Sequence, residues 1–198
     1  MAVRCMVMCV LLLTGCATEG PVAPESTQPD KAVVFGRAIA VLTGETSRPY
    51  RPRVRFMELM NRQTLDRFSI EIDSDDKMFI LQLPVGEYVF TRVQIAEGPF
   101  MSMADYDSSF KVGAEPVTYV GTWRFGIDSP RYGRMIVLSA VRDQHEELVA
   151  EQSLVQEYPA LDGKKITAAL PNPNEAQARL YEVMPYPRYP TYFRRQWW

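Results

Sequence analysis

The sequence predicts a mainly β protein, an antiparallel seven-stranded sandwich with one or two short helices after the strands. β-Branched and aromatic residues recur with period two, and turn residues separate these runs. No helical pattern interrupts them, so we expect no crossover helices of the kind that a parallel sheet requires. The expected strands are residues 32–42, 53–60, 68–72, 78–83, 87–95, 117–125 and 133–141.

Turn residues close most of these runs. Asn61-Arg62-Gln63, Asp73 to Asp76 and Pro84-Val85-Gly86 each fit a tight turn, because Asn and Asp bond their own backbone, Pro fixes φ and Gly permits positive φ. Residues 97–115 contain Pro, Gly and a Ser/Asp cluster, and we expect a long loop there. A loop of that length is uncommon unless it has a function.

The strand over residues 117–125 is expected to point its large side chains in one direction: Val117, Tyr119, Trp123 and Phe125. The period changes only after Arg142. Asp143 followed by Glu146 fits a helix N-cap, and we expect a helix that ends near Pro159. Its expected apolar face is Leu148, Leu154, Val155 and Tyr158, and a second short helix is expected within residues 174–183.

The first sixteen residues have the layout of a secretory signal. Arg4 precedes an apolar run over residues 5–13, too short for the ~20 residues of a membrane span. Leu13-Thr14-Gly15-Cys16 then resembles the lipobox of bacterial lipoproteins. That resemblance implies removal of residues 1–15 as a signal peptide and lipidation, with palmitate, of Cys16 as the first mature residue.

The same resemblance implies a location. Ala17 after the cysteine implies attachment to the outer membrane, with the domain facing the periplasm. Residues 16–31 are small, polar and Pro-rich, so we expect a flexible lipidated tether. The further divisions expected are a β-sandwich domain over residues 32–142, a helical extension over 143–183 and a Pro/aromatic tail over 184–198.

Composition argues against several functions. The chain has 22 Lys and Arg against 24 Asp and Glu, a net charge of −2, whereas nucleic-acid binders usually carry a basic face. The only histidine is His145, too few ligands for a zinc site, and the Asp73 to Asp76 turn lacks the pattern of a calcium loop. Without a nucleophile elbow of the G-x-S-x-G type, we expect no enzyme, no metal and no cofactor.

Two further segments carry a family resemblance. Leu83-Pro84-Val85-Gly86-Glu87-Tyr88 resembles the L-P-x-G-x-Y step of carboxypeptidase-regulatory-like, transthyretin-like sandwich modules. The run from Val117 to Thr122, followed by an acidic helix that closes on Tyr158-Pro159, is similar to small lipid-anchored bacterial proteins with that fold. The resemblance covers roughly residues 32–161 and implies a transthyretin-like or immunoglobulin-like sandwich without a catalytic residue.

The C-terminal tail has the composition of an interface hot spot. Its arginines are Arg188, Arg194 and Arg195, and its aromatic residues, the expected binding residues, are Tyr186, Tyr189, Tyr192, Phe193, Trp197 and Trp198. Alternatively, the tail folds back over an apolar face of the sandwich and belongs to the core.

The expected function is therefore a non-enzymatic structural or protein-binding role in the envelope. The contact would use a sheet edge, the 97–115 loop or the tail, and the partner would be another envelope protein. One alternative is a carbohydrate- or peptidoglycan-binding module with Trp123, Trp197 or Tyr106 as the stacking platform. Another is an accessory lipoprotein of a secretion assembly.

Overall fold

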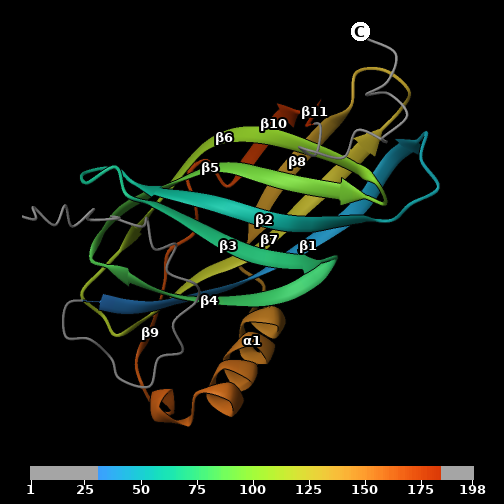
Figure 1. Cartoon of the computed structure of the whole chain (residues 1–198). Helices are drawn as coiled ribbons and strands as arrows, with labels where there is room; N and C mark the ends of the chain where they lie inside the picture. Colours follow the sequence, from blue (N-terminus) through green and yellow to red (C-terminus); the bar gives the residue numbers. More distant parts are fainter. Residues whose placement is uncertain (1–30, 184–198) are drawn as a thin grey trace, which may run out of the picture.

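Two facing β-sheets form a sandwich, and one helix lies outside the first sheet (Figure 1). A computed structural model describes residues 31–183 of the chain. The strands are β1 (Lys31–Thr46), β2 (Pro52–Asn61), β3 (Arg67–Ser74), β4 (Asp76–Pro84), β5 (Gly86–Glu97), β6 (Phe100–Val112), β7 (Val117–Ser129), β8 (Met135–Val141), β9 (Ile166–Ala168), β10 (Glu175–Arg179) and β11 (Tyr181–Glu182). The helices are α1 (Gln144–Glu157) and the 3-10 turn η1 (Pro159–Leu161). The predicted class, a mainly β sandwich, is confirmed.

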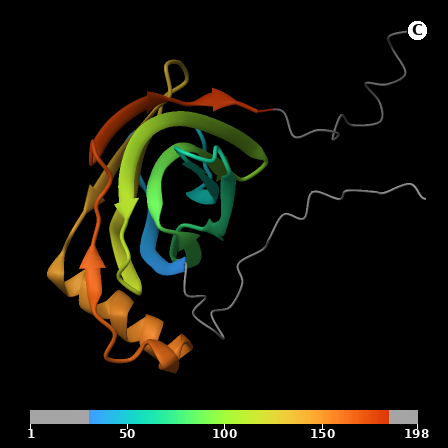
Figure 2. The ribbon, with the colours of Figure 1, turned by 90° about the vertical axis from the view of Figure 1, so that its left-hand side faces the viewer.

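The first sheet has the order β10-β8-β7-β1-β4, with β9 paired to β7, and the second has the order β11-β6-β5-β2-β3. Seen from the end at which the described chain begins, the sheets curve around a shared core, and β10 and β11 run along one side (Figure 2). No helix within residues 31–183 is long and apolar enough to cross a bilayer.

The prediction of a loop over residues 97–115 is wrong, because most of that segment is strand β6. β6 pairs with β5 along its length and with β11 at its start. The small hydroxyl residues Ser102 and Ser108 occupy fully buried positions of this strand. The composition resembles a loop because these two serines and the nearby aspartates interrupt the hydrophobic alternation, although Phe110 and Val112 of the same strand belong to the core.

The second predicted helix is also wrong. Residues 174–183 contain β10 and β11, which pair with β8 in one sheet and with β6 in the other. This segment therefore bonds to the edges of both sheets. Its pairing depends on partners distant in sequence, which local periodicity does not report.

Two strand pairs contradict the all-antiparallel expectation, because β7 is parallel both to β1 and to the short strand β9. The chain between β1 and β7 passes through β2 to β6, so strands rather than a helix make that crossover. The argument that parallel pairing needs a helix therefore fails for this pair, while every other pairing except β7 with β9 is antiparallel.

Gly121 reverses the faces of β7. The register between β1 and β7 shifts at this point, with one extra residue in β7, and Gly121 has φ +90°. A Cβ there would lie 2.5 Å from Leu170 Cδ2 and 2.8 Å from the Val141 carbonyl oxygen. Tyr119 consequently points to the outer face and Trp123 to the inner one, so the expectation that they face one way is wrong.

Two hydrophobic cores follow from this arrangement. The larger lies between the sheets around Trp123, Phe90 and Tyr88, and the smaller lies beneath α1. Asp143 caps α1 as expected, since its Oδ1 accepts a hydrogen bond of 3.0 Å from the Glu146 amide. The predicted face was partly wrong, because Leu148 is 51% exposed. The smaller core contains Val33, Phe35, Val117, Tyr119, Ala150, Leu154 and Leu161.

The strands define two ends of the molecule. The N-terminal pole holds the start of β1, the β2–β3 turn (62–66), the β4–β5 turn at Val85 and the β6–β7 connection (113–116). The distal pole holds the connections β1–β2 (47–51), β5–β6 (98–99) and β7–β8 (130–134), together with β11. At about 3.3 Å per residue, the 16 residues of β1 separate the poles by roughly 50 Å.

Candidate functional site

A network of charged side chains lies at the distal pole. Glu97, at the end of β5, is 1% exposed, and its Oε2 accepts hydrogen bonds from both Arg134 and Arg48. The contact to Arg48 Nη1 is 3.3 Å. The network joins the end of β5 to the β1–β2 and β7–β8 connections, whose arginines are 49 and 37 residues from Glu97 in sequence.

Arg134 is buried, and its guanidinium donates hydrogen bonds to two serine side chains. Its Nε donates to Ser129 Oγ at 2.8 Å, and its Nη1 donates to Ser102 Oγ at 2.6 Å. Burial lowers the pKa of Arg134 to about 10, and the positive charge of Arg48 acts in the same direction. The guanidinium still carries its charge at neutral pH, so the ion pair with Glu97 persists there.

Arg48 extends the network to the surface. Its Nη2 also donates to Glu182 Oε1 on β11, a side chain that is largely exposed. Within the described residues, Glu97 Oε1 has no hydrogen-bond partner although it is buried. Buried ion pairs contribute little net stability, but removal of one partner is costly. The network therefore acts mainly by fixing the relative positions of the connections that it joins.

Aromatic rings lie beside these charges. The Arg48 guanidinium lies 4.1 Å from the centroid of the Phe100 ring, and the Tyr50 and Phe100 rings are 6.3 Å apart. Gly98 has φ +61°, and a Cβ there would lie 2.6 Å from the Tyr50 ring, so the β1–β2 connection packs on the β5–β6 turn. Tyr132 is 79% exposed, with Arg131 5.5 Å from its ring. Such arginines and aromatic rings are typical of protein interfaces.

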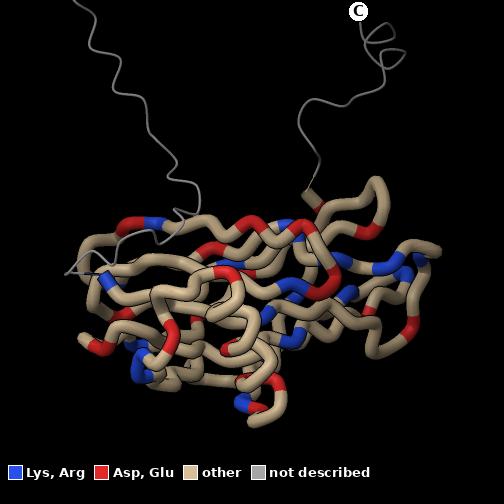
Figure 3. Tube along the Cα trace, turned by 90° about the horizontal axis from the view of Figure 1, so that it is seen from below, with Lys and Arg blue, Asp and Glu red and all other residues tan. Residues whose placement is uncertain are grey.

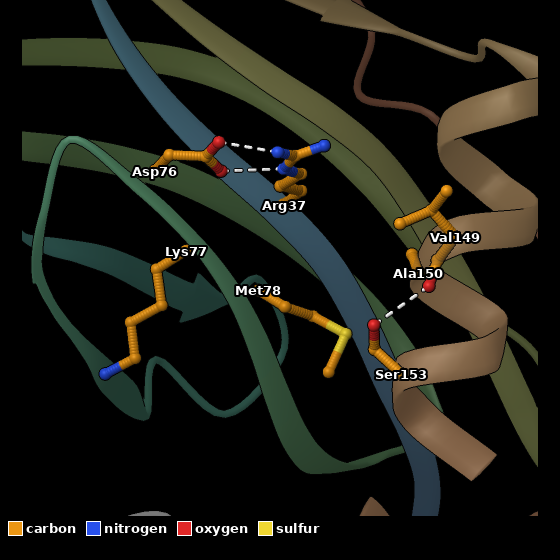
Figure 4. Close-up of a pocket in the computed structure, with 7 residues that line it drawn as sticks. All are labelled: Arg37, Asp76, Lys77, Met78, Val149, Ala150 and Ser153. Carbon is orange, nitrogen blue, oxygen red and sulfur yellow. Dashed lines mark hydrogen bonds and ion pairs between the residues drawn. The ribbon is translucent and has the colours of Figure 1, made fainter. Parts of the chain in front are cut away.

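A second candidate is a shallow groove of about 280 Å³ between β4 and α1 (Figure 4). Arg37 donates from Nε and Nη2 to the two carboxylate oxygens of Asp76, at 2.7 and 2.5 Å. Ser153 Oγ donates to the Val149 carbonyl oxygen at 2.9 Å, inside the helix. Because these polar groups already bond to one another, the groove offers little to a ligand.

The structure places Trp123 away from any surface, which corrects its proposed binding role. Its side chain is fully buried, and its Nε1 donates to the Val120 carbonyl oxygen at 2.9 Å. Tyr106 is partly buried, and its ring stacks on Phe90 at 5.2 Å. Burial also raises its pKa. Trp123 therefore has no face on which a sugar could stack, and Phe90 covers one face of Tyr106.

Several predicted residues lie outside the described part of the chain. These are Cys16 and the tail residues Tyr186, Tyr189, Tyr192, Phe193, Trp197 and Trp198. Within it, His145 is exposed on α1, and Asp73 forms an ion pair with Arg55 at 2.9 Å. Among residues 31–183, no group of three His, Cys, Asp or Glu side chains is placed to hold a metal ion.

Sequence reasoning missed the Glu97 network. Glu97 follows the apolar end of β5 and precedes Gly98-Pro99, where a charged residue normally faces solvent. Arg134 lies between the turn at Gly133 and the start of β8, where a charged residue also normally faces solvent. The sequence contains no signal for their contact, because each residue alone has an ordinary setting at the end of a strand.

Comparisons with known proteins add little to this description. No protein-family model matches the sequence, and no curated protein matches it. Among solved structures, the chain is similar to a DUF3823 family protein from Parabacteroides merdae with 16% identity and a TM-score of 0.27. The match covers 58% of this chain and 60% of that chain. A likeness this weak carries no argument about function, so the two sheets themselves define the fold class.

Proposed function

We propose that this protein is a lipid-anchored, non-enzymatic binding protein of the bacterial envelope. Palmitate on Cys16 attaches it to the outer membrane, the domain faces the periplasm, and the distal pole contacts another envelope protein. The lipobox-like sequence before Cys16 supports the anchor, and two or more acyl chains hold a soluble domain to a bilayer durably.

The separation of the two poles is the observation that carries this proposal. The described chain begins at Lys31, at the N-terminal pole, and the network around Glu97 lies at the opposite pole (Figure 1). An anchor that precedes residue 31 therefore attaches to the pole far from the exposed arginines and aromatic rings. The fold would hold this surface roughly 50 Å from the attachment point.

The chemistry of the distal pole favours binding over catalysis. Its buried polar groups are guanidinium, carboxylate and hydroxyl groups that bond mainly to one another. Arginine is a poor proton donor or acceptor near neutral pH, because it keeps its charge. A preorganised cluster that supports exposed rings is instead the usual basis of a protein-binding surface.

A glycan-binding role is the second candidate. Burial of Trp123 removes one of its expected platforms, whereas Tyr132 and Tyr50 present exposed rings at the distal pole. A role as an accessory of a secretion assembly would be one form of the protein-binding proposal.

Labelling and crosslinking in cells test the proposal. Labelled palmitate should be incorporated into the wild-type protein, which should be found in the membrane fraction. The Cys16→Ala protein should carry no label. A photocrosslinking residue at position 132 should capture a neighbouring protein, whereas the same residue at the exposed N-terminal-pole position Leu65 should not give that product. Label retained in Cys16→Ala would contradict the anchor, and identical products from both positions would contradict the binding pole. Capture of peptidoglycan at position 132 would favour the glycan alternative.

A further inference from the structure

We infer that the distal pole binds an acidic segment of its partner protein. This inference rests on the proposed function and specifies the chemistry of the partner. Its basis is the local charge, which is opposite in sign to that of the chain.

The distal pole is a positive region on a negative protein. Its four segments, residues 45–53, 97–100, 128–135 and 179–183, contain six arginines against four acidic residues, although the chain has a net charge of −2. Figure 3 shows blue positions near the right-hand end of the molecule, with red positions among them. An excess of one sign on one surface raises the local concentration of partners of the opposite sign.

Arg53 pairs with Asp73, but three other exposed arginines of these segments have no internal partner. Arg51, Arg131 and Arg179 are exposed, and none of them forms an ion pair with any residue from 31 to 183. By contrast, two of the four acidic residues, Glu97 and Glu182, are already bonded to Arg48. With the paired side chains set aside, three arginines remain against two acidic residues, Glu45 and Asp128, so the unpaired side chains keep a small positive excess.

Aromatic rings beside these cations give the surface an apolar component. Tyr50, Phe100 and Tyr132 are each at least partly exposed, and the buried network fixes the connections that carry the first two. Arginine can bind a carboxylate in a bidentate manner, while a neighbouring ring packs against an apolar side chain. The segment that fits best therefore alternates carboxylate and apolar side chains.

The described chain ends at the distal pole. β11 ends at the distal pole, where the Val183 amide donates to the Met101 carbonyl oxygen at 2.9 Å. Residues 184–198 contain Arg188, Arg194 and Arg195 and no Asp or Glu. The described chain thus ends at this pole, and all charged side chains in the residues that follow it are arginines.

Binding of defined peptides to the full-length protein in detergent tests the inference. The probe is a labelled synthetic peptide of alternating Glu and Tyr, and its control contains Gln in place of Glu. We expect fluorescence anisotropy to show binding of the Glu peptide only, weakened by salt. The triple variant Arg51→Glu, Arg131→Glu and Arg179→Glu should weaken binding by roughly tenfold or more.

The matched control is the triple variant Lys77→Glu, Lys111→Glu and Lys164→Glu, which makes the same change in net charge at exposed cations elsewhere. It should bind the Glu peptide as the wild type does. If the arginine-to-glutamate variant fails to fold, Gln at the same three positions replaces it. Equal binding of Glu and Gln peptides would overturn the inference, as would loss of binding in the lysine variant alone.

Two outcomes separate this inference from the proposed function. If a crosslink from position 132 persists in cells when the three arginines are reversed, the pole binds a partner but not through acidic groups, which overturns the inference alone. If the protein binds vesicles containing phosphatidylglycerol through the same arginines and ignores the Glu peptide, the ligand is a membrane surface and the inference is wrong. Peptide binding without any cellular crosslink would contradict the proposed function instead.

Discussion

The two poles of this sandwich differ in their buried contacts, because the long-range ion pairs of the N-terminal pole, Arg62–Glu87 and Lys165–Glu115, are exposed. At the N-terminal pole, Asn61 Oδ1 accepts from the amides of Gln63 and Thr64 at 2.9 and 3.1 Å, and the Tyr88 hydroxyl donates to the Pro84 carbonyl oxygen at 2.8 Å. These partners are two to four residues apart. At the distal pole, the contacts of Arg48 reach Glu97 and Glu182, which are 49 and 134 residues away.

This difference in contacts indicates how each pole maintains its structure. A turn bonded within itself can form early and alone, whereas the distal network exists only when both sheets and β11 are in place. The N-terminal pole should therefore tolerate changes elsewhere in the chain. The distal pole should respond to a change in any of its segments, which suits a surface whose parts must be held together for binding.

The largest expected loss of stability follows from removal of Arg134 at the distal pole. Arg134→Met leaves Glu97 buried with one fewer cation, and we expect a loss of about 3–5 kcal/mol in the free energy of unfolding. Urea denaturation of the full-length protein measures it. The double variant with Glu97→Leu should lose less than the sum of the two single variants, since they share one interaction. Simple additivity would mean that the pair does not act as a unit.

The next largest loss of stability is expected from a substitution at Gly121, which lies between the poles. Gly121→Ala combines positive φ with a collision against Leu170 and the Val141 carbonyl oxygen, so we expect destabilisation by about 3 kcal/mol. Thermal melting compares it with Gly113→Ala, where a Cβ meets nothing within 4 Å and no large loss is expected. Similar melting temperatures for the two variants would argue against the face reversal in β7.

Asn61 tests the locally closed pole. Asn61→Ala removes the acceptor for two turn amides, and we expect a loss of about 1 kcal/mol, because those amides can partly bond to water. The exposed neighbour Gln63→Ala should change the denaturation midpoint very little. A loss for Asn61→Ala as large as that for Arg134→Met would remove the distinction between the poles.

The smallest expected effect on stability is at Tyr132. Tyr132→Ala truncates an exposed ring, so the free energy of unfolding should change by less than about 0.5 kcal/mol. Affinity for the Glu and Tyr peptide should nevertheless fall several-fold in the anisotropy assay. Val85→Ala, at an exposed position of the N-terminal pole, is the control and should alter neither quantity. Unchanged peptide affinity in Tyr132→Ala would remove this ring from the binding surface.

The same contrast explains what the sequence could predict. The turns at Asn61 and Pro84 and the cap at Asp143 were recognisable, because each residue bonds within four positions of itself. The β-sandwich class followed from alternation along the strands. The buried network at Glu97 could not be found, because its partners become neighbours only after the sheets form.

Two errors have specific physical causes. Strict alternation placed Tyr119 and Trp123 on one face, and the extra residue at Gly121 moved them to opposite faces. Because of that shift, Trp123, which was proposed as a platform for sugar stacking, lies at the centre of the core. The segment over residues 97–115 has the composition of a loop because Ser102 and Ser108 occupy two of its buried positions and break the apolar alternation.

The direction of β1 has a mechanical consequence. Its hydrogen bonds to β4 on one side and β7 on the other lie across the long axis between the poles. Tension applied between residue 31 and the distal pole would load these two ladders in shear, so that many bonds must yield together. Tension applied through residue 183 would instead peel the two-residue strand β11 from β6 one bond at a time. Under force, the end that leads to Cys16 should therefore be the stronger attachment and the C-terminal end the first to yield.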